Sequence, residues 1–166
     1  MQNHTQLPTG LSFSYETERL ILRLPSTDYL REIHDFLYRN RSCFEKYEPT
    51  APENYYTLDF QQTLARCELK LALKLSSVRF YVFLKEDPST IIGTVCLHNI
   101  IKMPYFTSEV GYKFDASYQH HGYAREALSM ALSVGFYGLG LHKIFARCMP
   151  ENTPSRNLLH ALSLIH

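Results

Sequence analysis

The sequence Gln119-His120-His121-Gly122-Tyr123-Ala124 contains the strongest local signal in the chain. It lies between an expected strand over 108–114 and an expected helix over 124–136. Consecutive backbone N–H groups at a helix N-terminus form an anion site, and Gly122 permits a positive φ and close approach of a ligand. The patterns GxxxxGK[ST] and GxGxxG are absent, which excludes a Walker loop and a dinucleotide fingerprint. A glycine before a helix is also ordinary turn chemistry, so the hexapeptide alone leaves both interpretations open.

The rest of the chain alternates strand and helix periods, without repeats, low-complexity tracts or long linkers. The expected strands cover residues 19–24, 80–84, 91–100, 108–114 and 143–148. The expected helices begin at Ser26 or Thr27, run over 57–75 with Leu58, Leu64, Leu71 and Leu75 at helical spacing, run over 124–136, and begin again at Pro154. This order predicts an α/β (α+β) fold with a mixed, mostly antiparallel central sheet flanked by helices. The final strand–helix–strand crossover makes part of the sheet parallel.

Length and composition suit one domain over residues 1–166, with 1–14 as a flexible N-terminal segment. The formal net charge of +1 argues against nucleic acid or a membrane surface as a partner. No secretory signal or membrane span is expected, and four scattered cysteines without a CxxC pair favour a reduced, cytoplasmic setting. The eight histidines form no HxxxH or HExxH pattern, so no metal is expected.

Five motifs in this order resemble the GNAT superfamily of acetyltransferases, in its RimJ/RimL-like branch of ribosomal-protein N-terminal acetyltransferases. The resemblance covers nearly the whole chain. The motifs are TERLILR at 17–23 as the opening strand, EVGY at 109–112 as the fourth strand, QHHGYA at 119–124 as the Q/R-x-x-G-x-G/A pyrophosphate signature, LHKI at 141–144 as the late strand, and PENTPS at 150–155 as the PEN-x-x-S entry to the last helix.

The resemblance implies acetyl-CoA as co-substrate. Its pantetheine arm is expected to pair with the backbone of Val110, Gly111, Tyr112 and Lys113, where the fourth strand splays from the next. Its diphosphate is expected at Gln119, His120, His121, Gly122, Tyr123 and Ala124. Arg125 and the two histidines are candidates for pairing with phosphate, although Arg125 is equally consistent with a solvated surface residue.

Three residues are candidates for the chemistry of amine acetylation. Glu109 is the candidate base, acting through water, with an ordinary strand-edge carboxylate as the alternative. Asn152 is expected to bind the cofactor arm or order that water, and it also suits a helix N-cap. Ser155 is the candidate donor to the leaving sulfur, in place of the tyrosine of many relatives, and is otherwise a polar residue of the first helical turn.

The acceptor is less defined. A protein or peptide N-terminal amine is favoured, and a polyamine, amino sugar or amino acid, or a non-catalytic acetyl-CoA-binding module, are the alternatives. Tyr47, Tyr55 and Tyr56 are candidates for the wall of the acceptor pocket or for core packing. Family members continue past the last helix into a C-terminal hairpin, whereas this sequence ends at His166. An unpaired sheet edge, and with it a homodimer contact or weakened acceptor binding, is therefore expected.

Overall fold

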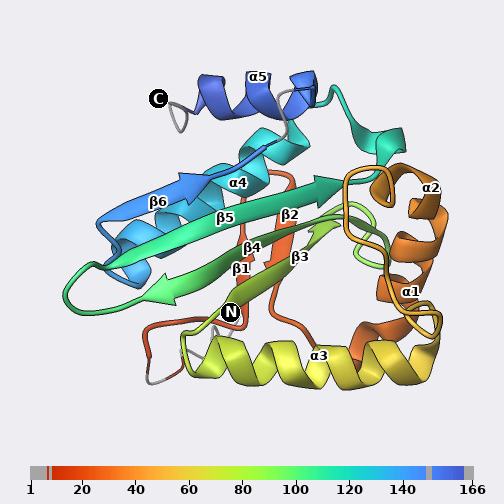
Figure 1. Ribbon diagram of the computed structural model, residues 1–166, viewed down its shortest axis with the longest axis horizontal. Helices are drawn as coiled ribbons and strands as arrows, with labels where there is room; N and C mark the ends of the chain where they lie inside the picture. Colours follow the sequence, from red (N-terminus) through yellow and green to blue (C-terminus); the bar gives the residue numbers. More distant parts are fainter. Residues whose placement is uncertain (1–6, 8, 149–150, 163–166) are drawn as a thin grey trace.

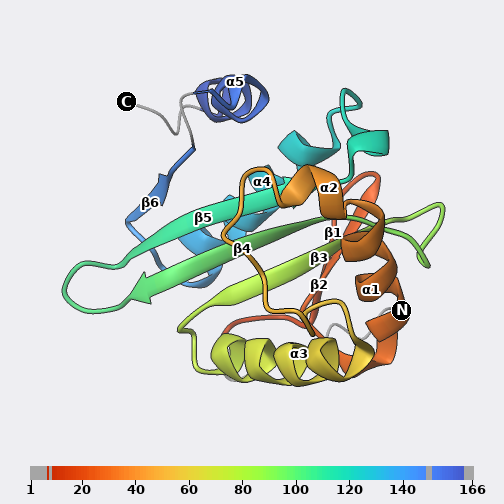
Figure 2. The same cartoon turned by 45° about the vertical axis from the view of Figure 1, so that its right-hand side comes forward.

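A computed structural model describes residues 7, 9–148 and 151–162. One six-stranded sheet, in the order β1-β2-β3-β4-β5-β6, lies at its centre with helices on both faces (Figures 1 and 2). The strands are β1 Ser14–Glu16, β2 Leu20–Arg23, β3 Val78–Leu84, β4 Ile91–Ile101, β5 Thr107–Phe114 and β6 Lys143–Ala146. The helices are α1 Leu30–Arg39, α2 Arg41–Phe44, α3 Leu58–Leu73, α4 Tyr123–Ser133 and α5 Thr153–Ala161, with short helical turns η1 Thr27–Tyr29, η2 Ala116–Tyr118 and η3 Val134–Gly138.

The strand pairing confirms the mixed, mostly antiparallel sheet. Neighbouring strands from β1 to β5 are antiparallel, and β5 pairs with β6 in parallel. Helix α4 makes the crossover between these last two strands, because the chain must return to the same end of the sheet to run parallel. The polar loop that precedes α4 therefore lies at the end of β5.

Two apolar clusters hold the helices against opposite faces of the sheet. Alternate residues of β3, β4 and β5 pack with Ala127, Leu128 and Ala131 of α4 and with Leu159 of α5. On the other face, Ile33, Phe36 and Leu37 of α1 pack against the remaining residues of β3. Because side chains alternate along a strand, the face without α4 also receives the polar residues of β4 and β5.

The predicted helix starts at Ser26 and Thr57 are confirmed. The Ser26 hydroxyl accepts from the Asp28 N–H at 3.1 Å, and the Thr57 hydroxyl accepts from the Phe60 N–H at 3.2 Å. The leucine spacing that predicted α3 does not mark its buried face. Leu58 and Leu71 are exposed, whereas Gln61, Ala65 and Ala72 are buried. Small alanine side chains allow α3 to approach the sheet closely, and the Gln61 amide is satisfied by donating to the Tyr55 carbonyl at 2.7 Å.

The N-terminal segment also differs from the expectation of flexibility over 1–14, in the part that the structure describes. Leu11 is fully buried in the cluster beside α4, and Ser14 begins β1, which pairs with β2. Burial of one large apolar side chain and pairing with a hairpin neighbour order this stretch. Within residues 7, 9–148 and 151–162, no helix is long and apolar enough to cross a membrane.

Candidate active site

The predicted phosphate loop connects η2 to α4 and leaves the helix N-terminus without a side-chain cap. Gly122 occupies the N-cap with φ 79°, and His120 also has a positive φ, 67°. A glycine has no side-chain oxygen to accept from the first N–H groups of the helix. These N–H groups, together with the positive end of the helix dipole, therefore provide donors for an anion.

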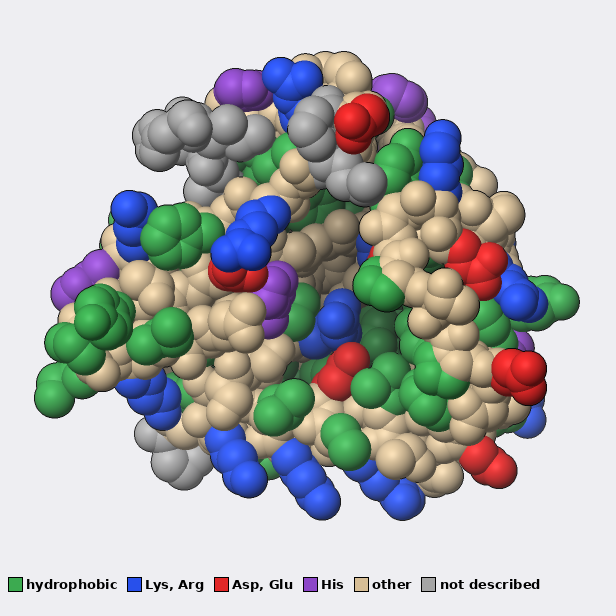
Figure 3. All heavy atoms as spheres, viewed as in Figure 1, with side chains coloured by type: hydrophobic (Ala, Val, Ile, Leu, Met, Phe, Trp, Pro, Cys, Tyr) green, Lys and Arg blue, Asp and Glu red, His purple; other side chains and the backbone are tan. Residues whose placement is uncertain are grey.

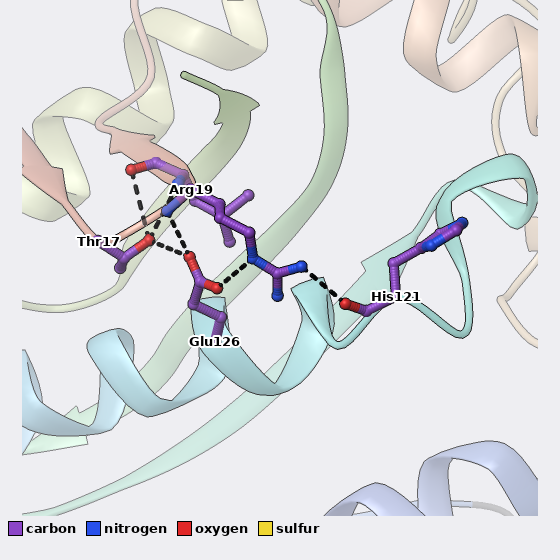
Figure 4. Close-up of polar contacts among 5 residues, drawn as sticks. Thr17, Arg19, His121 and Glu126 are labelled. Atoms are coloured by element: carbon purple, nitrogen blue, oxygen red, sulfur yellow. Dashed lines mark hydrogen bonds and ion pairs between the residues drawn. The ribbon is translucent and has the colours of Figure 1, made fainter. Parts of the chain in front are cut away.

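A polar network behind the loop fixes its position (Figure 4). Arg19 donates from Nε to Glu126 Oε1 at 2.8 Å and from a terminal nitrogen to the His121 carbonyl at 2.9 Å. The Thr17 hydroxyl donates to Glu126 Oε2 at 2.5 Å. The start of β2 is thereby joined to the first turn of α4, and the His121 ring points away from Arg19 (Figure 4).

The backbone conformation at residue 122 favours glycine, and the network packs closely against it. A Cβ at position 122 would lie 3.4 Å from an Arg19 guanidinium nitrogen, and L residues other than glycine are strained at φ 79°. The side chains exposed around the loop are those of Gln119, His120, His121 and Arg125. Tyr123 is half-buried, and the guanidinium carbon of Arg19 lies 4.4 Å from the centroid of the Tyr123 ring. The loop residues predicted from the sequence thus lie together.

The opening expected beside the fourth strand lies between β5 and β6. Strand β6 pairs with β5 only from Thr107 to Val110, where Ala146 is the last partner. Strand β5 continues to Phe114, and among the described residues no strand pairs with Gly111–Lys113 on this side. The two strands diverge there in Figure 1. Their backbone groups are therefore available to an extended ligand that pairs as a strand would.

Helix α5 lies beside this opening and is held by its own cap. The Asn152 side chain accepts from the Ser155 N–H at 3.3 Å, and the Tyr112 hydroxyl donates to the Ser155 carbonyl at 3.3 Å. The N-cap interpretation of Asn152 is confirmed, while its contact with a cofactor stays a prediction. Tyr112 fixes the first turn of α5 against β5, which brings Ser155 to the opening. The proton-donor role of Ser155 is likewise a prediction.

Glu109 lies on the other face of β5, in a row of charged groups. Its Oε2 is 3.2 Å from His98 Nε2 and 3.5 Å from Asn99 Nδ2, and its Oε1 is 2.8 Å from an Arg147 guanidinium nitrogen. These partners come from β4 and from the residue after β6, so α5 contributes none of them.

Further ion pairs line the same face, which is hollowed near its centre and surrounded by basic, acidic and histidine side chains (Figure 3). Arg79 pairs with Glu68 at 3.1 Å, and Lys113 pairs with Glu48 at 3.0 Å. Burial raises the pKa of the Glu68 carboxyl despite the opposing charge of Arg79. In the described part of the chain, Glu68 Oε2 is buried without a hydrogen-bond partner.

The three candidate tyrosines of the acceptor wall have different environments. Tyr55 is half-buried, and burial raises its pKa to about 12. Tyr55 and Tyr56 pack together edge to face and border the cluster under α1, whereas Tyr47 is exposed. Packing accounts for the first two, and the specificity role of all three stays a prediction. Among residues 7, 9–148 and 151–162, no group of three or more His, Cys, Asp or Glu side chains is arranged to hold a metal ion.

Sequence reasoning missed two parts of this site. The anchor formed by Thr17, Arg19 and Glu126 joins residues more than a hundred positions apart, and only the TERL motif pointed to the first half of it. His98 was considered only as a metal ligand, because its meeting with Glu109 depends on the register between β4 and β5. An alternating Cys–x–His pattern on a strand next to a strand carrying glutamate is the signal that was available.

A family model described as an acetyltransferase (GNAT) domain matches residues 19–164. The chain belongs to the GNAT family of acetyltransferases. Three Bacillus proteins named as N-acetyltransferases are 31%, 38% and 37% identical over 120, 93 and 89 residues, and the GNAT chain spans 66%, 51% and 49% of their lengths. The Escherichia coli [ribosomal protein uS5]-alanine N-acetyltransferase is 26% identical over 147 residues, which cover 88% of this chain and 75% of the relative.

Solved structures share the fold of this GNAT chain. The ribosomal-protein-S5-alanine acetyltransferase of Vibrio fischeri has a TM-score of 0.84 at 30% identity and covers 90% of this chain and 81% of its own. Mycobacterium smegmatis RimJ in complex with CoA-disulfide has a TM-score of 0.78 at 22% identity, covering 85% of this chain and 68% of its own. The predicted RimJ/RimL-like resemblance and fold are confirmed.

Proposed function

We propose that this protein transfers the acetyl group of acetyl-CoA to a primary amine, and that its acceptor is the N-terminal amine of a protein or peptide. The observation that carries the proposal is the uncapped N-terminus of α4 next to the opening between β5 and β6. Together they offer donors for a diphosphate and an unpaired strand backbone for an extended arm. Similarity to two ribosomal-protein alanine acetyltransferases supports the choice of acceptor.

Each predicted residue has a place in this proposal. The loop at 119–124, with Arg125, binds the phosphates, and Val110, Gly111 and Tyr112 align the arm. Acetyl-CoA supplies an activated acyl group that an amine attacks without a covalent enzyme intermediate. Residues 1–166 act as one domain.

Glu109 takes up a proton from the acceptor ammonium, directly or through water, so that the neutral amine can attack. This is required because an α-amino group has a pKa near ~7.7–8.0, which leaves much of it protonated at neutral pH. Ser155, held at the opening by Asn152 and Tyr112, hydrogen-bonds the leaving sulfur. Alignment of the two reactants across the sheet supplies the remaining rate enhancement.

A calorimetric titration with acetyl-CoA and dephospho-CoA tests the binding step. We expect saturable binding of both, with tighter binding of acetyl-CoA if the 3′-phosphate is recognised. Absence of binding at millimolar ligand would contradict the proposal. A second assay compares alanine- and serine-starting peptides with polyamines, amino sugars and amino acids. Transfer to the small amines alone would replace the proposed acceptor.

The variant Glu109→Gln separates an enzyme from a binding module. We expect unchanged acetyl-CoA affinity and a loss of turnover of ~10²-fold or more, because the amide has the size of the carboxylate but accepts no proton. Equal turnover by the variant would remove Glu109 from the mechanism. Binding without turnover in the wild-type protein, with every acceptor tested, would support the non-catalytic alternative.

A further inference from the structure

Three side chains lie next to one another on the face of the sheet away from α4. His98 lies between Cys96, two residues earlier on β4, and Glu109, directly opposite on β5. His98 Nε2 is 3.2 Å from Glu109 Oε2, and interaction with the neighbouring Cys96 thiol raises the pKa of the imidazole. None of the functional roles predicted from the sequence includes Cys96 or His98.

The glycine of β5 makes room for this arrangement. Gly111 is the register partner of Cys96, and a Cβ on it would lie 3.4 Å from His98 Cε1. The imidazole therefore lies over the backbone of Gly111, which is the first residue of β5 beyond its pairing with β6. A Cβ at position 111 would contact the ring directly. His98 is thus placed where the unpaired part of β5 begins.

The three side chains differ in their exposure to solvent. Cys96 is buried at 6% exposure, the Glu109 side chain is 21% exposed, and the His98 side chain is 39% exposed. Of the pair His98 and Glu109, the imidazole has the greater access to water. It is therefore suited to exchange protons with solvent, while Glu109 is suited to face a substrate.

We propose that His98 is a proton-relay residue that acts through Glu109, accepting the proton that Glu109 removes from the acceptor amine and releasing it to solvent. The inference rests on the proposed function. One proton leaves the ammonium for Glu109 and passes to His98 Nε2, so the carboxylate is restored. The neutral amine then forms the C–N bond and the C–S bond breaks. The second proton lost by the nitrogen passes to the leaving thiolate through the Ser155 hydroxyl or water, so the serine is restored.

The charges around His98 determine the pH at which the relay operates. The hydrogen bond to Cys96 raises the pKa of His98 most, burial opposes this, and Glu109 raises it further. Burial opposes ionisation of Cys96, but His98, Arg79 and the Ser77 hydroxyl outweigh it and lower the pKa of the thiol. Arg147 faces Glu109 from the end of β6. The relay needs neutral His98, so turnover should rise with pH through a pKa above the usual 6.5.

The pH dependence of turnover tests the relay, with the best acceptor from the amine panel. We expect His98→Gln to lose the rising limb and to reduce kcat at pH 8 by up to ~10²-fold, because glutamine keeps a hydrogen bond to Glu109 but takes up no proton. Cys96→Ser should keep the rising limb of the pH profile but move it to lower pH, because a serine hydroxyl does not ionise and no longer raises the His98 pKa. His142→Gln, at an exposed histidine at the start of β6, is the control with an unchanged profile.

A rising limb that persists in His98→Gln, with wild-type kcat, would overturn the relay. An NMR titration of the imidazole signals gives a second readout that needs no acceptor. The His98 pKa should fall in Cys96→Ser and in Glu109→Gln, and an unchanged value in both would also overturn the inference. Failure of the wild-type protein to acetylate any amine contradicts the proposed function instead, and the titration then still decides whether the three groups are coupled.

Discussion

The two helices that border the opening between β5 and β6 begin in opposite ways. Helix α5 has a side-chain cap, because Asn152 accepts from the Ser155 N–H. Helix α4 begins at Gly122 without a side-chain cap and is instead held from behind by Arg19 and Glu126. A side-chain cap satisfies one of the free N–H donors at a helix N-terminus, whereas an uncapped helix keeps that donor for a ligand. This difference is the basis for proposing that α4 binds the anion and that α5 positions Ser155.

The largest effect on acetyl-CoA binding is expected from a side chain added at the uncapped N-terminus of α4. Gly122→Ala adds a Cβ 3.4 Å from the Arg19 guanidinium at φ 79°, whereas Gly140→Ala, at φ 69°, meets nothing within 4 Å. Both variants should lose ~1–2 kcal/mol of unfolding free energy from backbone strain. Only Gly122→Ala should weaken acetyl-CoA binding, by ~10-fold or more. Thermal unfolding and calorimetry of the pair measure this, and equal affinities would remove the loop from the binding site.

Removing the cap of α5 should give a smaller and different effect. Asn152→Ala should cost ~1 kcal/mol, as should Thr57→Ala, which removes the cap of α3 far from the opening. Only the first variant should lower kcat, by several-fold, because Ser155 lies in the first turn of α5. Asn152→Asp keeps a capping oxygen and should retain activity. Matching kinetics for Asn152→Ala and Thr57→Ala would contradict a positioning role for this cap.

The anchor of α4 should be visible in the pH dependence of stability. Burial opposes ionisation of Glu126, but hydrogen bonds from Thr17 and Arg19 outweigh it and lower its pKa below the ordinary 4.5. Its stabilising contribution is therefore present above about pH 4.5 and is lost as pH falls through the lower, folded-state value. Denaturant unfolding of wild type and Glu126→Gln should differ at neutral pH and converge in acid. A constant difference would show that ionisation of Glu126 is not involved.

The effect of salt concentration on acetyl-CoA affinity should be the smallest. The α4 loop is exposed, so its attraction for phosphate is screened within a Debye length of ~10 Å at 0.1 M salt. We expect acetyl-CoA binding to weaken by a few-fold between low and moderate ionic strength, while the pH profile assigned to the half-buried His98 shifts little. Calorimetry at several salt concentrations measures the first effect. Affinity independent of salt would argue against a charged contact at the loop.

The spacing of apolar residues and the positions of turn and capping residues predicted the elements that carry strong local signals. The strands from Val78 to Phe114 are rich in β-branched and aromatic residues and are separated by turn residues. Thr57 and Asn152 begin helices as capping residues do. The buried face of α3 was not predicted, because close packing selected alanines over the more hydrophobic leucines. Strand β1 has three residues, too few for a period to be recognised.

Only the part of the site formed by contiguous residues was predicted from the sequence. The loop at 119–124 is a contiguous motif whose chemistry lies in its backbone, so the sequence is enough to locate it. The meeting of His98 with Glu109 depends on strand register, and the reach of Arg19 to Glu126 depends on how α4 packs against β2. Contacts of this kind are set by tertiary structure, and local patterns do not encode them.

The most direct test of the account follows the backbone amides of the protein by NMR while acetyl-CoA is added. The account predicts saturable shifts at the first N–H groups of α4, from Tyr123 to Glu126, and at Gly111–Lys113 on the unpaired part of β5. The capped first turn of α3 should remain unchanged. Saturable binding that leaves both α4 and β5 unperturbed, or no binding at millimolar ligand, would contradict the central claim.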